Sequence, residues 1–519
     1  MAYRKYLAVL IAIMMVLTTF PAIAGAEDPV PEPSFAFIPN MGDASVSRVD
    51  LTAETPSVVA RYYTAPRTGE TGVWGDLFGS NEGVMTAIDP VGWRTSRIAI
   101  DGNGDAWALN TGADAGGMTT KTVQGSVALI QFDTSALTNT STAAGDIKTF
   151  GTDDAVTVFP VGDRGDIPRC INVDEDGYLW IGFHKAYEKY GYFQQFDFDG
   201  LNLTAMGDRI YGAAEFDETE VNGTVPEFDI APYNAVIDKT GTVWFVSYGS
   251  TRVGRNGGTY GSDNGVYSFN IADPIGTFTR HEESSPVGDS MGYMKSGYGI
   301  IVDDSGPEVI VYVTIMDTTG GSVPGLYVKV GDADFVKVNI SLSAPRGMAF
   351  DENGVLWIAN SSGGSVTCYD PDGIVATQTF TGFGSTPVGI GRDSEGRMWV
   401  IVRDNSRMVG FDPDDPSDRI LITSGFNLPY AYGDFTRPEP PRGKICGTKY
   451  EDFYTGAQAR EKIKDWVIYL FDRQLAPGVE PDVSVEGYLE HIETDEFGNY
   501  CFENLAYGTY YVYEQWDSC

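Results

Sequence analysis

The sequence is poor in the side chains that metal centres and many catalytic sites use. Its 519 residues include three histidines, His184, His281 and His491, and only five cysteines. No cysteine or histidine spacing matches a zinc or haem site. Gly-x-Ser-x-Gly, His-Glu-x-x-His and phosphate-loop motifs are also absent. These absences favour a protein that binds over one that catalyses.

Positive charge is scarce as well. The chain has 35 Lys and Arg against 72 Asp and Glu, which gives a formal net charge of −37. A surface this acidic repels nucleic acid and anionic lipid. We therefore expect no nucleic-acid partner.

Only one stretch is long and apolar, and it lies at the N-terminus. Arg4 and Lys5 precede an apolar run over 7–20, and small residues follow around Ala24 and Ala26. This order is typical of a cleaved signal peptide, so residues 1–26 are expected to be removed. We expect the rest to be soluble after cleavage and extracellular or at the cell surface. How it is attached to the envelope stays open.

Helical periodicity is nearly absent before residue 455, and strands with Gly-rich turns take its place. Asp, then Gly three residues later and Trp six residues later, recurs with one fixed spacing. The five copies are Asp101/Gly104/Trp107, Asp174/Gly177/Trp180, Asp238/Gly241/Trp244, Asp351/Gly354/Trp357 and Asp393/Gly396/Trp399. A sixth copy keeps Asp303 and Gly306 but has Val309 at the Trp position. All-strand repeats of roughly 40–60 residues predict a β-propeller of four-stranded blades.

The six copies give six blades, and the two ends of the region supply a seventh. Residues 35–40 and the two strand patterns after them match the later part of a blade without its innermost strand. Residues 429–434 match an innermost strand with nothing behind it. We therefore expect an all-β chain with a seven-bladed propeller over 33–435. One blade is shared between the two ends, so the ring has no free edge.

The repeated Asp, Gly and Trp are interpreted as structural. Asp at the head of such a turn accepts hydrogen bonds from its own backbone, and Gly takes the positive φ. Close acid pairs such as Asp174 and Asp176 could also hold a cation. Because the turn recurs in every blade, we favour turn chemistry, with the Trp packed between neighbouring sheets.

Candidate ligand-binding residues lie on the innermost strands, five residues before each turn Asp. These positions hold Ser96, Arg169, Tyr233, Tyr298, Arg346 and Val388, with Tyr430 equivalent in the shared blade. Arg and Tyr together suit sugars, carboxylates and anionic glycans. The residues predicted to form a ligand-binding mouth are Arg97, Arg169, Tyr233, Tyr298, Arg346 and Tyr430. Alternatively, these side chains fill the tunnel and pair with buried acids.

Long loops favour the same face of the propeller as the working surface. They lie between second and third strands at 110–124, 183–191 and 247–265. In a propeller these loops share a face with the turns that lead into the innermost strands. His184 falls in the second loop and is expected to be solvated.

The propeller region resembles the NHL-like and streptogramin-lyase-like propellers. The likeness rests on the stretches TSRIAID, PRGMAFD, WIAN and GSVTCYD. It implies the fold and leaves function open, because propellers host enzymes, adhesins and scaffolds alike. Streptogramin lyases use a His-centred site with Mg²⁺, and no histidine here falls on an innermost strand, where that family would have it.

After residue 435 the composition changes. A Pro-rich linker over 436–444 leads into residues 445–519, which resemble the B-type (SD-repeat, prealbumin-like) domain of surface adhesins. The matching residues are Thr494, Asp495, Gly498, Tyr500, Phe502, Asn504, Leu505, Gly508, Tyr510, Val512 and Glu514. The resemblance implies a small β-sandwich. The chain stops where the family usually continues, so we expect a truncated domain.

In that family a loop after the first strand often binds Ca²⁺. Here only Asp452 and Glu461 keep acidic positions in the loop. Ca²⁺ takes about 6–8 oxygen ligands, so we expect no cofactor, with calcium the weaker alternative.

The cysteines predict little cross-linking. Cys170 and Cys368 fall in different blades and should not bridge each other. In the C-terminal domain, Cys446–Cys501 or Cys501–Cys519 could form one disulfide in an exported protein.

Two functions from different classes remain. The first is an extracellular or cell-surface binding or adhesion protein, whose propeller face binds a glycan or surface protein and whose C-terminal domain is a stalk. The second is a secreted propeller enzyme, a lyase or a lactone or ester hydrolase, with a metal on the axis. The scarcity of catalytic residues favours the first.

Overall fold

The computed structural model describes most of the propeller region and part of the C-terminal region. The described residues are 34–66, 95–111, 124–135, 137–142, 146–164, 166–184, 191–212, 230–248, 252–253, 259–260, 264–281, 297–305, 308–316, 323–431, 435–436, 443–451, 461–471, 475, 479–485, 488–505 and 511–514. Every regular element among them is a strand. They contain no helix that is long and apolar enough to span a membrane. The expected signal peptide at 1–26 and linker residues 437–442 lie outside them.

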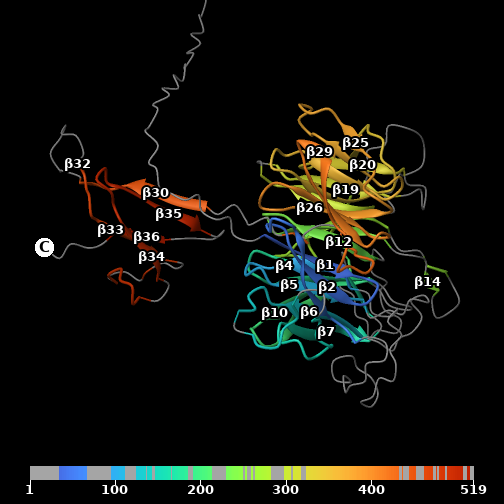
Figure 1. Ribbon diagram of the computed structural model, residues 1–519, viewed down its shortest axis with the longest axis horizontal. Coiled ribbons are helices and arrows are strands. Elements are labelled where there is room, and N and C mark those ends of the chain that lie inside the picture. The colour runs from blue at the N-terminus through green and yellow to red at the C-terminus, as the bar shows by residue number, and fades with distance from the viewer. Residues whose placement is uncertain are drawn as a thin grey trace, which may run out of the picture.

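Six four-stranded antiparallel sheets follow one another along the chain, each ordered from its innermost to its outermost strand (Figure 1). Blade 1 consists of β4 (Thr95–Ile100), β5 (Ala106–Asn110), β6 (Gln124–Ile130) and β7 (Val156–Arg164). Blade 2 consists of β8 (Ile167–Val173), β9 (Leu179–His184), β10 (Tyr192–Phe198) and β11 (Leu203–Ile210). Blade 3 consists of β12 (Pro232–Ile237), β13 (Thr242–Ser247), β16 (Gly265–Asn270) and β17 (Thr279–His281). Blade 4 consists of β18 (Gly297–Asp303), β19 (Ile310–Ile315), β20 (Gly325–Val330) and β21 (Val336–Lys337). Blade 5 consists of β22 (Pro345–Phe350), β23 (Leu356–Asn360), β24 (Ser365–Tyr369) and β25 (Gln378–Phe380). Blade 6 consists of β26 (Pro387–Arg392), β27 (Met398–Val402), β28 (Arg407–Asp412) and β29 (Asp415–Ile422). Each innermost strand contacts the innermost strand of the next blade. Two short strands, β14 (Arg252–Val253) and β15 (Thr259–Tyr260), pair between β13 and β16.

The seventh blade joins the two ends of the propeller. It contains β1 (Phe35–Asn40), β2 (Ser45–Asp50) and β3 (Ser57–Tyr63), and the segment 429–436 pairs with β1. The amide of Tyr430 donates to the carbonyl of Pro39 at 2.9 Å, and the amide of Phe37 donates to the carbonyl of Phe435 at 2.8 Å. The seven-bladed all-β fold expected from the repeats is confirmed.

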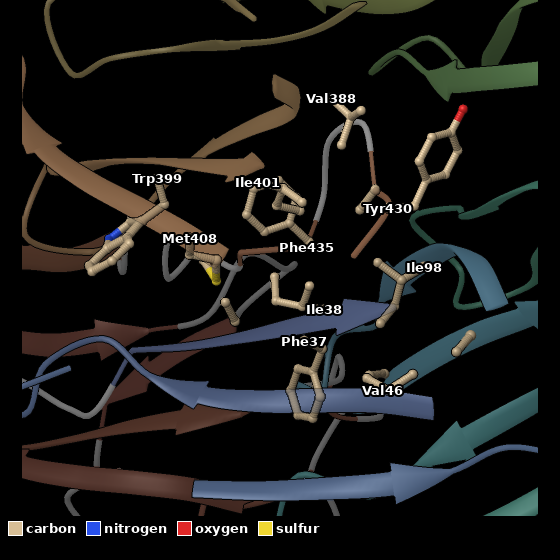
Figure 2. Close-up of a cluster of buried hydrophobic side chains, with 14 of the residues drawn as sticks. Phe37, Ile38, Val46, Ile98, Val388, Trp399, Ile401, Met408, Tyr430 and Phe435 are labelled. Atoms are coloured by element: carbon tan, nitrogen blue, oxygen red, sulfur yellow. The ribbon is translucent and has the colours of Figure 1, made fainter. Parts of the chain in front are cut away.

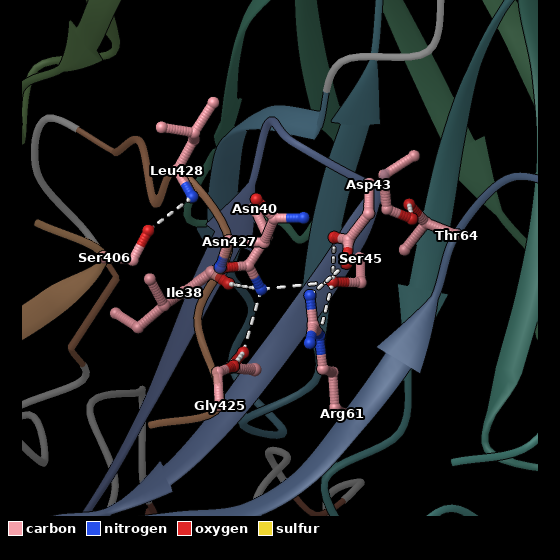
Figure 3. Close-up of polar contacts among 12 residues, drawn as sticks. Ile38, Asn40, Asp43, Ser45, Arg61, Thr64, Ser406, Gly425, Asn427 and Leu428 are labelled. Atoms are coloured by element: carbon pink, nitrogen blue, oxygen red, sulfur yellow. Dashed lines mark hydrogen bonds and ion pairs between the residues drawn. The ribbon is translucent and has the colours of Figure 1, made fainter. Parts of the chain in front are cut away.

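A buried asparagine ties this blade to the end of blade 6. Asn40 is fully buried, and its Oδ1 accepts from the amide of Asn427 at 2.9 Å. Its Nδ2 donates to the hydroxyl of Ser47 at 2.8 Å, and that hydroxyl donates to the carbonyl of Gly425 at 2.6 Å (Figure 3). Both ends of the amide therefore have partners, which a buried amide needs if burial is not to cost stability.

Apolar side chains complete the closure. Phe37 and Ile38 on β1 belong to one buried cluster with Ile401 on β27 and with Phe435 (Figure 2). Phe435 and Ile401 have no exposed surface. Residues almost 400 positions apart therefore bury one another, and the hydrophobic effect stabilises the closed ring.

The repeated turns have the expected chemistry and one further contact. In all five full copies the turn Gly has a positive φ, between 73° and 88°. The Asp Oδ1 accepts backbone amides, and its Oδ2 accepts from the Trp indole Nε1 at 2.7–2.9 Å. Sequence reasoning placed the Trp in the core but missed this indole bond. It joins the turn to the second strand of the same blade.

The sixth copy corrects one expectation. In the full copies the Trp is paired in register with the residue two before the turn Asp, as Val236 is with Trp244. In blade 4 the residue two before the turn Asp is Ile301, and its register partner is Tyr312, not Val309. The connection between β18 and β19 is longer there, so an aromatic residue still occupies the Trp place three positions later in the sequence.

The C-terminal strands form small sheets of their own. They are β30 (Gly443–Thr448) with β35 (Asn499–Leu505), β31 (Tyr450–Glu451) with β32 (Glu461–Lys462), and β34 (Tyr488–Glu493), β33 (Val467–Phe471) and β36 (Tyr511–Glu514) in that order. Leu470 and Phe502, from different sheets, share a buried core. The likeness of this part to a B-type adhesin domain stays a prediction.

The cysteines follow the expected pattern where they are described. Cys170 and Cys368 are buried and free, so they do not bridge each other. Cys501 is disulfide-bonded, and its register partner on β30 is Cys446. Cys519 lies outside the described residues.

Candidate functional site

Each of the six four-stranded blades has a β-bulge in its innermost strand. The register with the second strand shifts at Ser96, Arg169, Tyr233, Tyr298–Gly299, Arg346–Gly347 and Val388. These are the positions five residues before each turn Asp. A bulge leaves one residue out of the ladder and turns its side chain. The position identified from the repeats is therefore where the strand can direct a side chain towards the axis.

Three tyrosines from three blades meet at one point. The hydroxyl of Tyr233 donates to that of Tyr298 at 2.8 Å, and the hydroxyl of Tyr430 lies 2.7 Å from Tyr298 Oη and 3.3 Å from Tyr233 Oη. All three side chains are buried. Because they come from blades 3, 4 and 7, their meeting point lies on the propeller axis.

Four arginines surround these rings. The guanidinium carbons of Arg169 and Arg97 lie 4.7 Å and 4.9 Å from the ring centre of Tyr233. Arg346 lies 4.8 Å from the ring centre of Tyr298 and donates to its hydroxyl at 3.4 Å. We call Arg97, Arg169, Tyr233, Tyr298, Arg346, Arg403 and Tyr430 the axial cluster.

Arg403 is the member that sequence reasoning missed. Its guanidinium carbon lies 5.9 Å from the ring centre of Tyr430, and its Nε pairs with the carboxylate of Asp404 at 2.7 Å. It follows β27, in the connection between the second and third strands of blade 6. Those connections were assigned to the working face, so a search of the short ones for cations would have found it.

The charges of the cluster act on the tyrosine hydroxyls. Burial opposes ionisation of Tyr233, but the charges of Arg169 and Arg97 and its hydrogen bonds with the hydroxyls of Tyr298 and Tyr430 lower its pKa to about 7. Burial and the neighbouring Tyr233 raise the pKa of Tyr298 and of Tyr430. The three hydroxyls therefore titrate as one unit, and one proton leaves near neutral pH.

A cavity of about 220 Å³ lies next to the cluster along the innermost strands. Arg97 lines it and belongs to both. Its other walls are mainly apolar, with Asn172, Asn234, Arg392 and Thr436 as polar residues. Arg97 is itself buried, and its Nε and Nη2 donate to the carbonyl of Tyr233 at 3.3 Å and 3.2 Å. The Arg97 side chain is thus held in place between the axial cluster and the cavity.

The predicted site residues are all accounted for. The structure brings together the six residues of the predicted mouth, which are Arg97, Arg169, Tyr233, Tyr298, Arg346 and Tyr430. Val388 and Ser96 are fully buried, and Val388 belongs to the hydrophobic cluster at the ring closure. Asp452 lies outside the described residues, and Glu461 is described only as backbone in β32.

One histidine expectation is wrong. His184 is the last residue of β9 and is buried, with its Nε2 3.0 Å from the carbonyl of Tyr248. It is thus not a solvated loop residue, because β9 continues two residues into the loop expected at 183–191. Among the described residues, no three His, Cys, Asp or Glu side chains are grouped as metal ligands. Most of the long loops predicted to form the working face lie outside the described residues.

The family comparison agrees with the fold. A family model described as the SMP-30/gluconolactonase/LRE-like region matches residues 227–380. This stretch spans blades 3 to 5 and is less than half of the chain. The comparison with curated proteins gives no match.

Solved structures give only distant likenesses. Virginiamycin B lyase from Staphylococcus aureus is 12% identical with a TM-score of 0.42, over 66% of this chain and 88% of that one. A protein from Lactobacillus plantarum is 13% identical with a TM-score of 0.43, over 77% and 98%. Hydrazine synthase from Kuenenia stuttgartiensis is 12% identical with a TM-score of 0.42, over 79% and 100%. The matched stretch and the seven sheets together describe a β-propeller that is similar in part to the SMP-30/gluconolactonase type.

Proposed function

We propose that this protein is an exported binding protein, extracellular or at the cell surface, whose propeller holds an anionic glycan at the axial cluster. The C-terminal strands would serve as its stalk. The observation that carries the proposal is the convergence of four guanidinium groups and three tyrosines on one axis. In a chain with a net charge of −37, such a concentration of cations is local and specific.

The chemistry of the cluster suits a carboxylated sugar. Guanidinium groups bind carboxylates through two parallel hydrogen bonds. Tyrosine presents an apolar ring with a polar tip, which suits a ligand that has both C–H faces and hydroxyls. Arg169, Arg346 and Arg403 are only partly buried, so they would make the first contacts.

The alternative is a secreted lyase or lactone or ester hydrolase with a metal on the axis. Such a site needs carboxylate, histidine or amide ligands there. The described side chains that meet on the axis are instead arginines and tyrosines. We therefore keep binding as the proposed function.

A glycan-array screen tests the proposal. The full chain should retain uronic-acid glycans in preference to neutral ones, and Arg169→Gln and Arg346→Gln should each weaken retention. Arg397→Gln is the matched control, because Arg397 lies 3.7 Å from Glu395 in a turn of blade 6 and outside the cluster. Binding to neutral glycans only, or equal binding of uronic-acid glycans by all variants, would contradict the proposal.

The surface location is tested separately. Fractionation of source cells with an antibody to the chain should find it in the envelope or medium. Recovery from the cytoplasm would contradict this part.

A further inference from the structure

A second polar pocket lies away from the axis, between blades 3 and 4. Its volume is about 610 Å³. Trp244, Ser268 and His281 line it from blade 3. Lys329 and Asp332 line it from blade 4. Trp244 belongs to the repeated turn of blade 3. Neither that turn nor the axial cluster explains why a serine, a histidine and a lysine gather here.

A serine and a histidine are hydrogen-bonded in this pocket. Ser268 is on β16 and His281 is at the end of β17, and Ser268 Oγ lies 2.8 Å from His281 Nε2. The imidazole lies against the indole of Trp244, with ring centres 4.7 Å apart and planes 31° apart. The edge of the ring also meets Phe335 at 6.2 Å. Two aromatic neighbours thus hold the imidazole in the orientation that aims Nε2 at the hydroxyl.

Burial and one nearby charge keep this histidine neutral. Burial, and then the charge of Lys329, lower the pKa of His281 to about 4. A neutral imidazole with its proton on Nδ1 accepts the proton of the serine hydroxyl at Nε2, which is the arrangement of a nucleophile and its base. Lys329 is largely buried and donates to the carbonyl of Ala333 at 2.6 Å. Burial lowers the pKa of Lys329, and the charges of Asp332 and Asp334 offset part of this effect.

We propose that Ser268, His281 and Lys329 form a catalytic site for hydrolysis of a short-chain acyl ester. Hydroxyl side chains line the same pocket, at Thr240, Thr242 and Thr279. They suit an ester whose alcohol part is itself hydroxylated, such as an O-acetylated sugar. This inference is independent of ligand binding at the axial cluster.

The reaction proceeds in two balanced steps. Ser268 Oγ attacks the acyl carbon while His281 Nε2 takes the hydroxyl proton, and the negative oxygen that forms is stabilised by the Lys329 ammonium. The bond from the acyl carbon to the alcohol oxygen then breaks, and the alcohol leaves with the proton from His281. Water attacks the acyl-serine and gives a proton to His281. The acyl–Oγ bond breaks, Oγ regains that proton, and the acid is released.

The test labels the full chain with a fluorophosphonate probe and maps the site by peptide mass spectrometry. The label should sit on Ser268. Ser268→Ala should lose both the label and the hydrolysis of 4-nitrophenyl acetate, by about a hundredfold or more. Ser126→Ala is the control, because Ser126 is a buried serine on the third strand of blade 1 that accepts from Asn110. It should keep both.

The pH profile separates catalysis from a structural role. The rate should be level around neutral pH and fall as pH drops through about 4, where His281 becomes protonated. His281→Gln should slow the reaction without removing the fold, as checked by thermal unfolding. Labelling of other serines only, or hydrolysis equal in wild type and folded Ser268→Ala, would overturn the proposal. If Ser268→Ala does not fold, the mapped label on the wild type decides it.

Discussion

Asp393 shows how much one residue of the repeat does. Its Oδ1 accepts from the amides of Glu395 and Arg397 at 3.0 Å and 2.9 Å. Its Oδ2 accepts from Trp399 Nε1 at 2.7 Å. The carboxyl is almost fully buried, and burial raises its pKa. The carboxylate therefore needs each of these donors to offset its desolvation.

Removing the indole donor tests this residue. Trp399→Phe should lower the free energy of unfolding by about 1–3 kcal/mol, because the buried Oδ2 of Asp393 loses its hydrogen-bond donor. It keeps only the longer contact with Arg397 Nη1, at 4.0 Å. Denaturant unfolding followed by fluorescence or circular dichroism measures it. The control is the adjacent Met398→Leu, a volume-conserving change that should cost less than about 1.5 kcal/mol. No loss beyond that of the control would refute a role for the indole bond.

The axial tyrosines make a second prediction at this scale. Since the pKa of Tyr233 is about 7, the near-ultraviolet absorbance of tyrosinate should grow as pH rises through neutrality. Tyr233→Phe should remove this step. Tyr192→Phe should keep it, because burial and the charge of Asp166 raise the pKa of Tyr192. A single tyrosinate transition near pH 10, the ordinary value, would contradict the prediction.

The titration of Tyr233 predicts the direction in which ligand affinity changes with pH. Below neutral pH the cluster has neutral phenols and four guanidinium charges, and above it one phenolate cancels part of the positive charge. Affinity for an anion should therefore fall as pH rises through about 7.

The residue scale also marks the limit of sequence reasoning. Arg169, Tyr233, Tyr298 and Arg346 could be predicted because they recur at one offset from the turn Asp. Arg403 was missed because it lies outside that offset, in a short connection between the second and third strands that the search for cations did not cover.

At the scale of the strand, the tight turn and the bulge cooperate. The turn fixes where the innermost strand ends, and the bulge five residues earlier frees one side chain from the ladder. Alternation of apolar and polar residues predicted the strands but not the bulges, because a bulge is a change of register between two strands. In the sequence, each bulge was marked only by its fixed distance of five residues from the turn Asp.

Gly354 tests the turn itself. Its φ is 79°, and an added Cβ would meet nothing within 4 Å. Gly354→Ala should therefore cost about 1–2 kcal/mol from backbone strain alone, measured as the free energy of unfolding. Gly102→Ala is the matched control: it also meets nothing within 4 Å and has no positive φ. Equal stability of the two variants would disprove the strain.

On the scale of the whole molecule, the ring is closed by residues from its two ends. Tyr430, Ala431 and Phe435 are buried against β1 and blade 6. The sequence predicted this shared blade, because each end showed the part of a blade that the other lacked. It could not predict the contacts of Asn40, which depend on the register between distant segments.

Two truncations test the closure. A chain that ends after residue 436 keeps the closing segment, and one that ends after residue 427 lacks it. Both lack the C-terminal strands, so they differ only in the closing segment. The first should unfold in one cooperative thermal transition, and the second should melt at a clearly lower temperature or lose the transition, because β1 is left as a free edge. Identical melting would contradict a closing role.

Calorimetric titration with an oligogalacturonate at about pH 6 and low salt tests the central claim most directly. The wild type should bind it, and Arg346→Gln should bind at least about tenfold more weakly, since a hydrogen bond to a charged group contributes about 1.5–3 kcal/mol. Arg397→Gln should match the wild type. An affinity that is the same in all three proteins, or no binding of any carboxylated glycan by the wild type, would contradict an anion site on the propeller axis.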